Sequence, residues 1–216
     1  MIYRTAEVVK DVLVAIDENR RSDQLIAEGD IDTLSLEAII RSKIEEGVRM
    51  VHCEAPLTML ESGHTFVGGS SGDLFIDDSG RGFVALPRDF MRLLIFRMSD
   101  WERPVTEAIS ESDARYKLQF SRYKGIYGNP QKPVVAIVRR SEGKVLEFFS
   151  CKDSNAKVAQ ASYIPFPAIK DGLIDISEEC YRAAVYRISA LALATLKDEL
   201  STALMEISRG FLGINN

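Results

Sequence analysis

The stretch SEECYRAAVYRISALALATLKDELSTALMEISRG, residues 177–210, carries the longest helical period in the chain. Apolar or small residues recur every three or four positions from Tyr181 to Ile207, which is the spacing of one face of an α-helix. A helix over 177–209 would be about 50 Å long at 1.5 Å per residue, and Gly210 would end it. That length exceeds the width of a small domain. We therefore predict a long C-terminal helix that packs against other helices of the chain or against another subunit.

Two further helices are predicted near the N-terminus. The first spans 5–21, with Thr5 as its N-cap, and the second begins after Thr33 or Ser35 and ends before Pro56. Their apolar positions are Ala6, Val9, Leu13 and Ile16 in the first helix and Leu36, Ile40, Ile44, Val48 and Val51 in the second. These helices are candidates to pack against the C-terminal one.

The middle of the chain has the pattern of strands. VVAIVRR (134–140) and KVLEFFSC (144–151) are rich in β-branched or aromatic residues and flank a short loop with a glycine, which predicts a β-hairpin. Other strands are expected in FVALP (83–87), in 93–105 and in 158–166. Glycines, serines and aspartates interrupt 62–82, so we expect a loop or hairpin there with a short strand at 74–76.

The fold class that follows is α+β. N-terminal helices and a long C-terminal helix form a helical bundle, and the middle region is antiparallel and β-rich. We expect one structural domain over 1–216, with a helical part at 5–56 and 177–210 and a β-rich insertion at 62–170. A short helix is expected after Ser110 and Asp113, which have capping-box spacing.

The composition argues against several classes of function. The formal charge of −5 argues against a protein that holds nucleic acid by neutralising phosphates. Three widely spaced cysteines fit reduced, buried side chains and a reducing compartment. Charged residues in MIYRTAEVVKDVL leave no apolar run for a secretion signal, and no stretch has the roughly 20 apolar residues of a spanning helix, so we expect no membrane partner.

The sequence offers no recognisable catalytic, metal or cofactor site. The only histidines are His52 and His64, and neither belongs to a metal-ligand cluster. Cys53 lacks the neighbours of an activated nucleophile, and the segment GGSSGD lacks the GK[ST] ending of a phosphate loop. We expect a protein that is not an enzyme and that binds no cofactor.

Basic and aromatic residues alternate in one segment. Arg115, Lys117, Arg122 and Lys124 interleave with Tyr116, Phe120 and Tyr123. This is the composition of a nucleic-acid surface or of a mixed polar and aromatic protein interface.

The run FVALPRDFMRLLIFRMSDWERPVTEAIS (83–110), followed by SYIPFP (162–167) and an alanine-rich helix, resembles the head-to-tail adaptor or neck ring proteins of short-tailed bacteriophages, crAss-like phages in particular. The likeness covers residues 8–210 in the order of elements, and it is specific at residue level only from LPRDF to RPVTE. It implies a virion protein, assembled in the host cytoplasm, that forms a ring of twelve copies beneath the portal protein. Other neck or tail proteins would be its neighbours, and DNA would be passing cargo.

Function and interface follow as expectations. The chain would extend the portal channel for genome retention and ejection; the alternatives are an intracellular scaffold or adaptor unrelated to phage, or a hydrolase with an unrecognised site. We expect the segments 62–82 and 210–216 to become ordered against neighbours. The candidate interface residues are Phe66, Phe75, Trp101, Tyr127, Phe211, Leu212 and Ile214.

Overall fold

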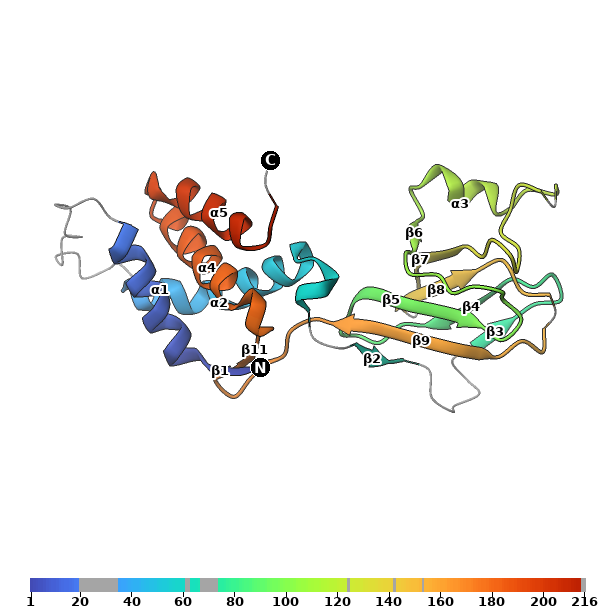
Figure 1. Ribbon diagram of the computed structural model, residues 1–216, viewed down its shortest axis with the longest axis horizontal. Coiled ribbons are helices and arrows are strands. Elements are labelled where there is room, and N and C mark those ends of the chain that lie inside the picture. Colours follow the sequence, from blue (N-terminus) through green and yellow to red (C-terminus); the bar gives the residue numbers. More distant parts are fainter. Residues whose placement is uncertain are drawn as a thin grey trace. The chain divides into compact units, whose positions relative to one another are not determined.

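The computed structural model describes residues 1–19, 35–60, 63–66, 74–123, 125–141, 143–152 and 154–214. They belong to two compact units, a helical unit of Met1–Glu61 with Phe166–Asn216 and a β-rich unit of Ser62–Pro165 (Figure 1). The first unit contains the segments 5–56 and 177–210 that were expected to be helical, and the second lies within the segment 62–170 that was expected to be β-rich. The α+β class with an antiparallel β-rich middle region is confirmed.

The helical unit is organised around α4. Its helices are α1 (Thr5–Asn19), α2 (Leu36–Glu54), α4 (Tyr181–Thr195) and α5 (Leu200–Phe211), and α4 packs against the other three. The predicted apolar stripes of α1 and α2 meet α4 in a single core. A Cβ atom on Gly47 would lie 2.6 Å from Cγ1 of Ile188, so a glycine lets α2 and α4 approach closely.

The prediction of one long C-terminal helix is wrong, because the chain turns between Thr195 and Leu200. Lys197 adopts a left-handed conformation with φ 56°. The Asp198 side chain then accepts a hydrogen bond from the Leu200 amide at 2.9 Å and starts α5. The turn folds the second half of the stripe back onto the first, so that α4 and α5 bury Leu193 and Leu204 in one core.

A small sheet completes the helical unit. Its strand order is β1 (Ile2–Arg4), β11 (Leu173–Asp175) and β10 (Ile169–Lys170), all antiparallel. The β-rich unit therefore ends at Pro165 and not at 170, since β10 and β11 pair with the N-terminal strand. Two 3-10 turns, Leu57–Met59 and Glu178–Cys180, follow α2 and precede α4.

The β-rich unit contains two sheets. The three-stranded sheet has the order β2 (His64–Thr65), β9 (Val158–Pro165) and β5 (Phe90–Met98). The five-stranded sheet has the order β3 (Leu74–Ile76), β4 (Gly82–Ala85), β8 (Gly143–Phe148), β7 (Val135–Arg140) and β6 (Ile109–Ser110). All pairs are antiparallel except β6 with β7. The predicted hairpin is β7 and β8, and the predicted short helix is α3 (Ala114–Leu118), capped by Asp113.

Aromatic side chains dominate the core of the β-rich unit. Phe96, Trp101 and Phe148 are almost completely buried and contact one another edge-on or tilted, with ring centroids 5.6 to 6.2 Å apart. The turn before β5 is held by Asp89, whose carboxylate accepts a hydrogen bond from the Tyr163 hydroxyl at 2.9 Å. Phe90, Phe96 and Trp101 of the segment 83–105 therefore belong to this core.

Parts of two predictions lie outside the described residues. Within the segments expected to become ordered against neighbours, residues 62, 67–73 and 215–216 are not described, and neither is Lys124 of the basic and aromatic segment. In the described parts of the chain, no helix is long and apolar enough to cross a membrane.

Candidate functional site

One face of the five-stranded sheet carries a row of side chains whose positions follow from the pairing of its strands. Phe75 of β3 lies opposite Phe83 of β4, Phe83 lies opposite Glu147 of β8, and Glu147 lies opposite Ala136 of β7. Directly opposed residues point to the same face of a sheet, and the neighbouring residues point to the other. The opposite face packs into the aromatic core. On the face of this row a smaller cluster with Tyr116 of α3 covers Ala136 and Glu147, whereas Phe83 is partly buried and Phe75 is exposed.

The segment after α3 borders this face. Gln119 is buried and fixes the segment through two hydrogen bonds, from its Nε2 to the Arg115 carbonyl at 2.9 Å and from the Gly128 amide to its Oε1 at 2.8 Å. This anchor places Phe120 against Phe149, with ring centroids 5.6 Å apart. A buried amide therefore positions an aromatic residue that is itself 53% exposed.

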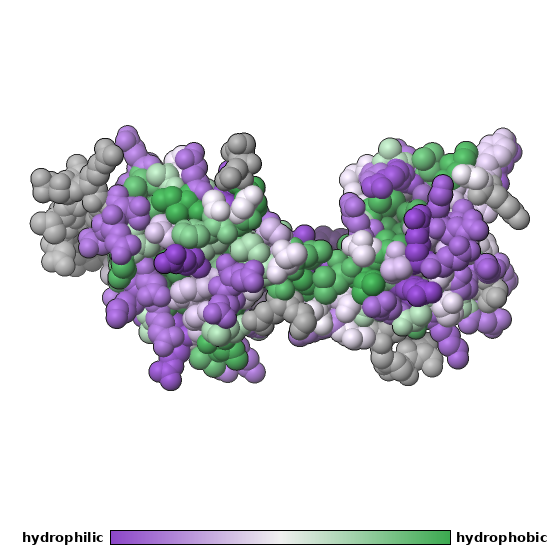
Figure 2. Space-filling view, in the orientation of Figure 1, coloured by the Kyte–Doolittle hydropathy of each residue, from purple (hydrophilic) through white to green (hydrophobic). Residues whose placement is uncertain are grey.

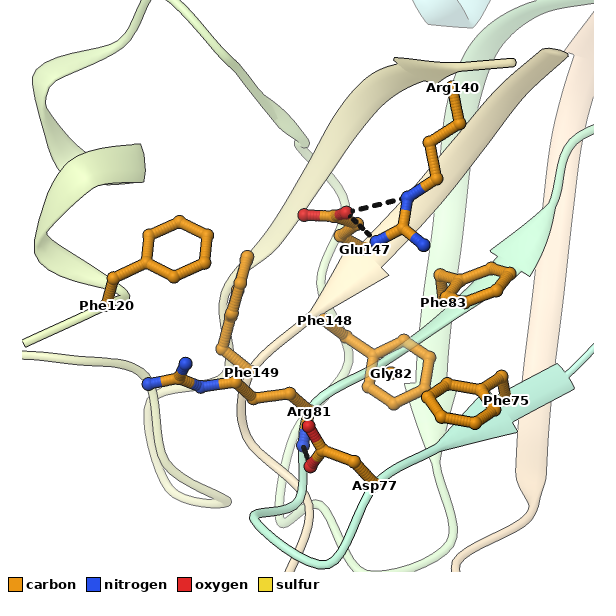
Figure 3. A pocket seen from close by; sticks show the side chains of 10 residues that line it. All are labelled: Phe75, Asp77, Arg81, Gly82, Phe83, Phe120, Arg140, Glu147, Phe148 and Phe149. Atoms are coloured by element: carbon orange, nitrogen blue, oxygen red, sulfur yellow. Dashed lines mark hydrogen bonds and ion pairs between the residues drawn. The ribbon is translucent and has the colours of Figure 1, made fainter. Parts of the chain in front are cut away.

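An open cleft of about 230 Å³ lies between the sheet and this segment (Figure 3). Its aromatic lining consists of Phe75, Phe83, Phe120, Phe148 and Phe149. Gly82 and the polar residues Asp77, Arg81, Arg140 and Glu147 complete the lining. Phe75 and Phe120 are about half exposed, so the cleft presents aromatic surface to the solvent. Figure 2 shows further apolar residues at the surface over α3, where Leu118 is also exposed.

Gly82 allows β3, β4 and the Phe148 ring to approach one another. A Cβ atom at this position would lie 2.1 Å from the Phe75 carbonyl oxygen and 2.6 Å from Cζ of Phe148. Both distances are far below van der Waals contact, so any other residue would displace the strand or the ring. The shape of the cleft floor therefore depends on this glycine.

An ion pair and a phenol hold one wall of the cleft. The Arg140 guanidinium donates through Nε and Nη2 to Oε1 of Glu147 and lies 4.2 Å above the Phe83 ring. The other oxygen of Glu147 accepts a hydrogen bond from the Tyr116 hydroxyl at 2.9 Å. Burial, together with this hydrogen bond, raises the pKa of Tyr116 to about 12. Both carboxylate oxygens of Glu147 are therefore used inside the unit.

The β3–β4 turn forms the opposite wall. Oδ1 of Asp77 accepts hydrogen bonds from the Ser79 amide, the Ser79 hydroxyl and the Arg81 amide, at 2.8, 2.6 and 3.0 Å. Partial burial would raise the pKa of Asp77, but these hydrogen bonds outweigh it and hold the pKa below its ordinary value. The Arg81 guanidinium donates to the Gln119 carbonyl at 3.2 Å and lies 5.4 Å from the Phe120 ring centre.

The lining of the cleft is aromatic and charged. Its lining combines aromatic faces with two arginines and two carboxylates, and no histidine, cysteine, serine or lysine is among the lining residues. Glu147 and Asp77 already accept hydrogen bonds from within the unit. The surface is therefore suited to cover an apolar side chain of a partner while its arginines meet acidic groups nearby.

The structure brings only one of the predicted interface residues, Phe75, into this cleft. In the same unit, Phe66 is partly buried against Phe96 and Tyr163, and Tyr127 is also partly buried. Trp101, 1% exposed, lies in the core between Phe96 and Phe148, so it offers no surface to a partner.

The three predicted interface residues of the helical unit follow α5 or end it. Phe211 is 38% exposed and contacts Tyr186, with ring centroids 5.4 Å apart. Ile214 is partly buried against the helical core, and Leu212 is buried in it. Leu212 is thus a core residue, because the turn after α5 folds it back onto the bundle.

The remaining cleft residues were not predicted from the sequence. The alternation of side chains along a strand would have placed Glu147 and Phe149 on one face, which is the one signal that was available. Phe120 was noted only as part of a basic and aromatic segment. Nothing in the sequence connected it to Phe75, 45 positions earlier.

The histidines and cysteines lie outside the cleft. His52 is buried in α2 and His64 is exposed in β2, 6.0 Å from the Tyr163 ring. Cys151 and Cys180 are buried as expected, whereas Cys53 is exposed near the end of α2. Among the described residues, no group of three or more His, Cys, Asp or Glu is placed to hold a metal ion.

No protein-family model matches the chain, and no curated protein matches it either.

Proposed function

We propose that this chain is a structural subunit of a head-to-tail connector ring in a short-tailed bacteriophage virion. The ring extends the portal channel through which the genome is retained and ejected, and its partners are further copies of the chain, the portal protein and neighbouring neck or tail proteins. The observation that carries the proposal is the half-exposed aromatic cleft on the β-rich unit, because such a surface is typical of an interface between proteins.

The residues behind the sequence resemblance support a structural role. In the LPRDF motif, Phe90 stacks on Tyr163 at 5.6 Å and Asp89 holds the Tyr163 hydroxyl. In the RPVTE motif, Val105 pairs with Phe96 through two backbone hydrogen bonds of 2.8 Å. The residues of these two motifs thus make contacts within the β-rich unit, which is compatible with a role in specifying a scaffold.

Native mass spectrometry and negative-stain images test the proposal, with the purified chain alone and mixed with its portal protein. We expect closed rings of one stoichiometry, with twelve copies as the expected number. A chain that stays monomeric under both conditions would contradict the proposal and favour a scaffold unrelated to phage or a hydrolase.

A further inference from the structure

The two units carry opposite formal charge. Residues 62–165 contain 15 Lys and Arg against 12 Asp and Glu, which gives +3. The rest of the chain contains 12 Lys and Arg against 20 Asp and Glu, which gives −8. A basic unit and an acidic unit in one chain are complementary surfaces for two copies of that chain, since opposite potentials steer and align partners.

The exposed face of α1 combines acidic groups with an apolar side chain. Val14 is 46% exposed, so α1 presents an apolar side chain to the solvent. Its neighbours one helical turn away are Lys10, Asp11, Asp17 and Glu18, all exposed. This face therefore presents one apolar contact point within a mainly acidic surrounding.

We infer that the aromatic cleft of one copy docks the exposed face of α1 in a second copy. The inference rests on the proposed assembly and names the surfaces that meet. Val14 would cover the rings of Phe75 and Phe120, and the acidic residues beside it would face Arg81 and Arg140. A guanidinium has five N–H donors, more than the contact of Arg140 with Glu147 uses.

Such a contact joins unlike surfaces. Each copy offers a cleft to one neighbour and its α1 face to the other, so the interface is heterologous and repeats from copy to copy. Copies joined by a heterologous interface form a closed ring when the rotations from one copy to the next add up to a full turn. The docking of α1 in the cleft therefore supplies the kind of contact that a ring requires.

A single-stranded nucleic acid is the other ligand that stacks on aromatic rings beside arginines. The chain carries a formal charge of −5, whereas a ligand held through its phosphates needs a basic surface. The α1 face brings only a few carboxylates, which the two arginines of the cleft can meet. The observations therefore favour the α1 face over a nucleic acid.

Photo-crosslinking from position 75 tests the inference on the assembled full-length chain. A Phe75→p-benzoylphenylalanine variant is irradiated in the ring, and the linked peptides are mapped by mass spectrometry. We expect links to residues 5–19 of a second copy. Links to the β-rich unit of a second copy, to the portal protein or to nucleic acid, or rings without links from this position, would overturn the inference and leave the ring itself standing. Failure to assemble at all would overturn both the ring and the docking.

Point variants give an independent measurement of the dissociation constant for self-association by analytical ultracentrifugation. We expect Phe75→Ser and Asp17→Lys each to weaken association about tenfold, since central aromatic and charge contacts of an interface commonly have that effect. Tyr123→Ser is the matched control, because Tyr123 is 60% exposed in the same unit but does not line the cleft. If Tyr123→Ser weakens association as much as Phe75→Ser does, or if neither test variant changes it, the assignment of the cleft is wrong.

Discussion

Arg187 of α4 is completely buried although it carries a full charge. Its Nη1 and Nη2 donate to the two carboxylate oxygens of Glu54 in α2, and its Nε donates to the Ser208 hydroxyl in α5 at 3.2 Å. Ser208 in turn donates to the Ala183 carbonyl. One side chain thus joins three helices, and its burial is favourable only while its carboxylate partner remains in place.

Glu54→Gln tests this ion pair. The hydrogen bond from Arg187 lowers the pKa of Glu54 below 4.5, although partial burial opposes the shift. The pair therefore contributes stability that is present above pH 4.5 and is lost as the pH falls through the lower pKa of the folded state. We expect Glu54→Gln to reduce the free energy of unfolding by about 2 kcal/mol near neutral pH, less than for a fully buried pair because Glu54 is 34% exposed.

The measurement is urea unfolding of both proteins at about pH 6 and about pH 3. The difference between wild type and variant should shrink at the lower pH, because Glu54 is then protonated in the unfolded chain, and this protonation offsets the stability that the ion pair contributes to the folded state. A difference of the same size at both values would show that the substitution acts through packing and not through the charge.

Gly82→Ala tests the floor of the cleft. The new methyl group would collide with the Phe75 carbonyl and the Phe148 ring, so we expect a loss of about 3 kcal/mol in the free energy of unfolding. Gly125→Ala is the control, since no atom lies within 4 Å of a Cβ built there. Thermal melts that are equal for the two variants would contradict the close approach at Gly82.

At the scale of elements, helical period predicted α1 and α2 closely, because the signal lies within a few residues of the feature it sets. The predicted N-cap Thr5 is instead the first residue of α1, and its hydroxyl donates to the Gly172 carbonyl at 2.9 Å. Ser35 caps α2 as one of two candidates, and its hydroxyl oxygen accepts a hydrogen bond from the Ala38 amide at 3.3 Å. The break after α4 was not predictable in this way. It contains no glycine or proline, and Lys197 takes a conformation that its residue type disfavours.

The cleft could not be predicted from local sequence signals either. Its lining comes from β3, β4, β7, β8 and the segment after α3, so it depends on strand pairing between distant parts of the chain. A period in the sequence gives the face on which a residue lies, but it does not give the strand beside it. Phe75 could therefore be named as a candidate, whereas its neighbours could not.

Lys197→Gly tests the turn between α4 and α5. A left-handed conformation costs a residue with a Cβ atom about 1 kcal/mol, and glycine avoids that cost. We expect Lys197→Gly to raise the melting temperature by a few degrees and Lys197→Ala not to raise it. A melting temperature that falls with glycine would indicate that the turn conformation differs from the one described.

Ala192→Asp tests the packing of α4. Ala192 is fully buried in the helical core, where a carboxylate would have no partner. The substitution should cost about 4 kcal/mol in the free energy of unfolding. Ala203→Asp is the matched control, because Ala203 is exposed on α5. A variant that melts like the wild type would contradict the position of Ala192 in the core.

At the scale of the whole molecule, the chain combines a discontinuous helical unit with a β-rich unit that is continuous in sequence. The helical unit has a formal charge of −8 and the β-rich unit has a formal charge of +3. Electrostatic attraction between exposed charges weakens as salt screens them, so assembly through these unlike units should weaken in concentrated salt. Sedimentation of the wild-type chain in low and high salt would measure this effect, and an assembly that strengthens with salt would point to a purely apolar contact.

The discontinuity of the helical unit also has a consequence for translation. The ribosome releases α1 and α2 before the β-rich unit, but it releases α4, the helix against which both pack, only after that unit. The β-rich unit is complete once Pro165 has emerged, and pairing of His64 with Tyr163 brings its two ends together. The nascent chain should therefore fold from its middle outward, with the N-terminal helices waiting unpaired for the C-terminal ones. During that interval their apolar faces would be exposed, and exposed apolar surface makes a nascent chain prone to aggregation.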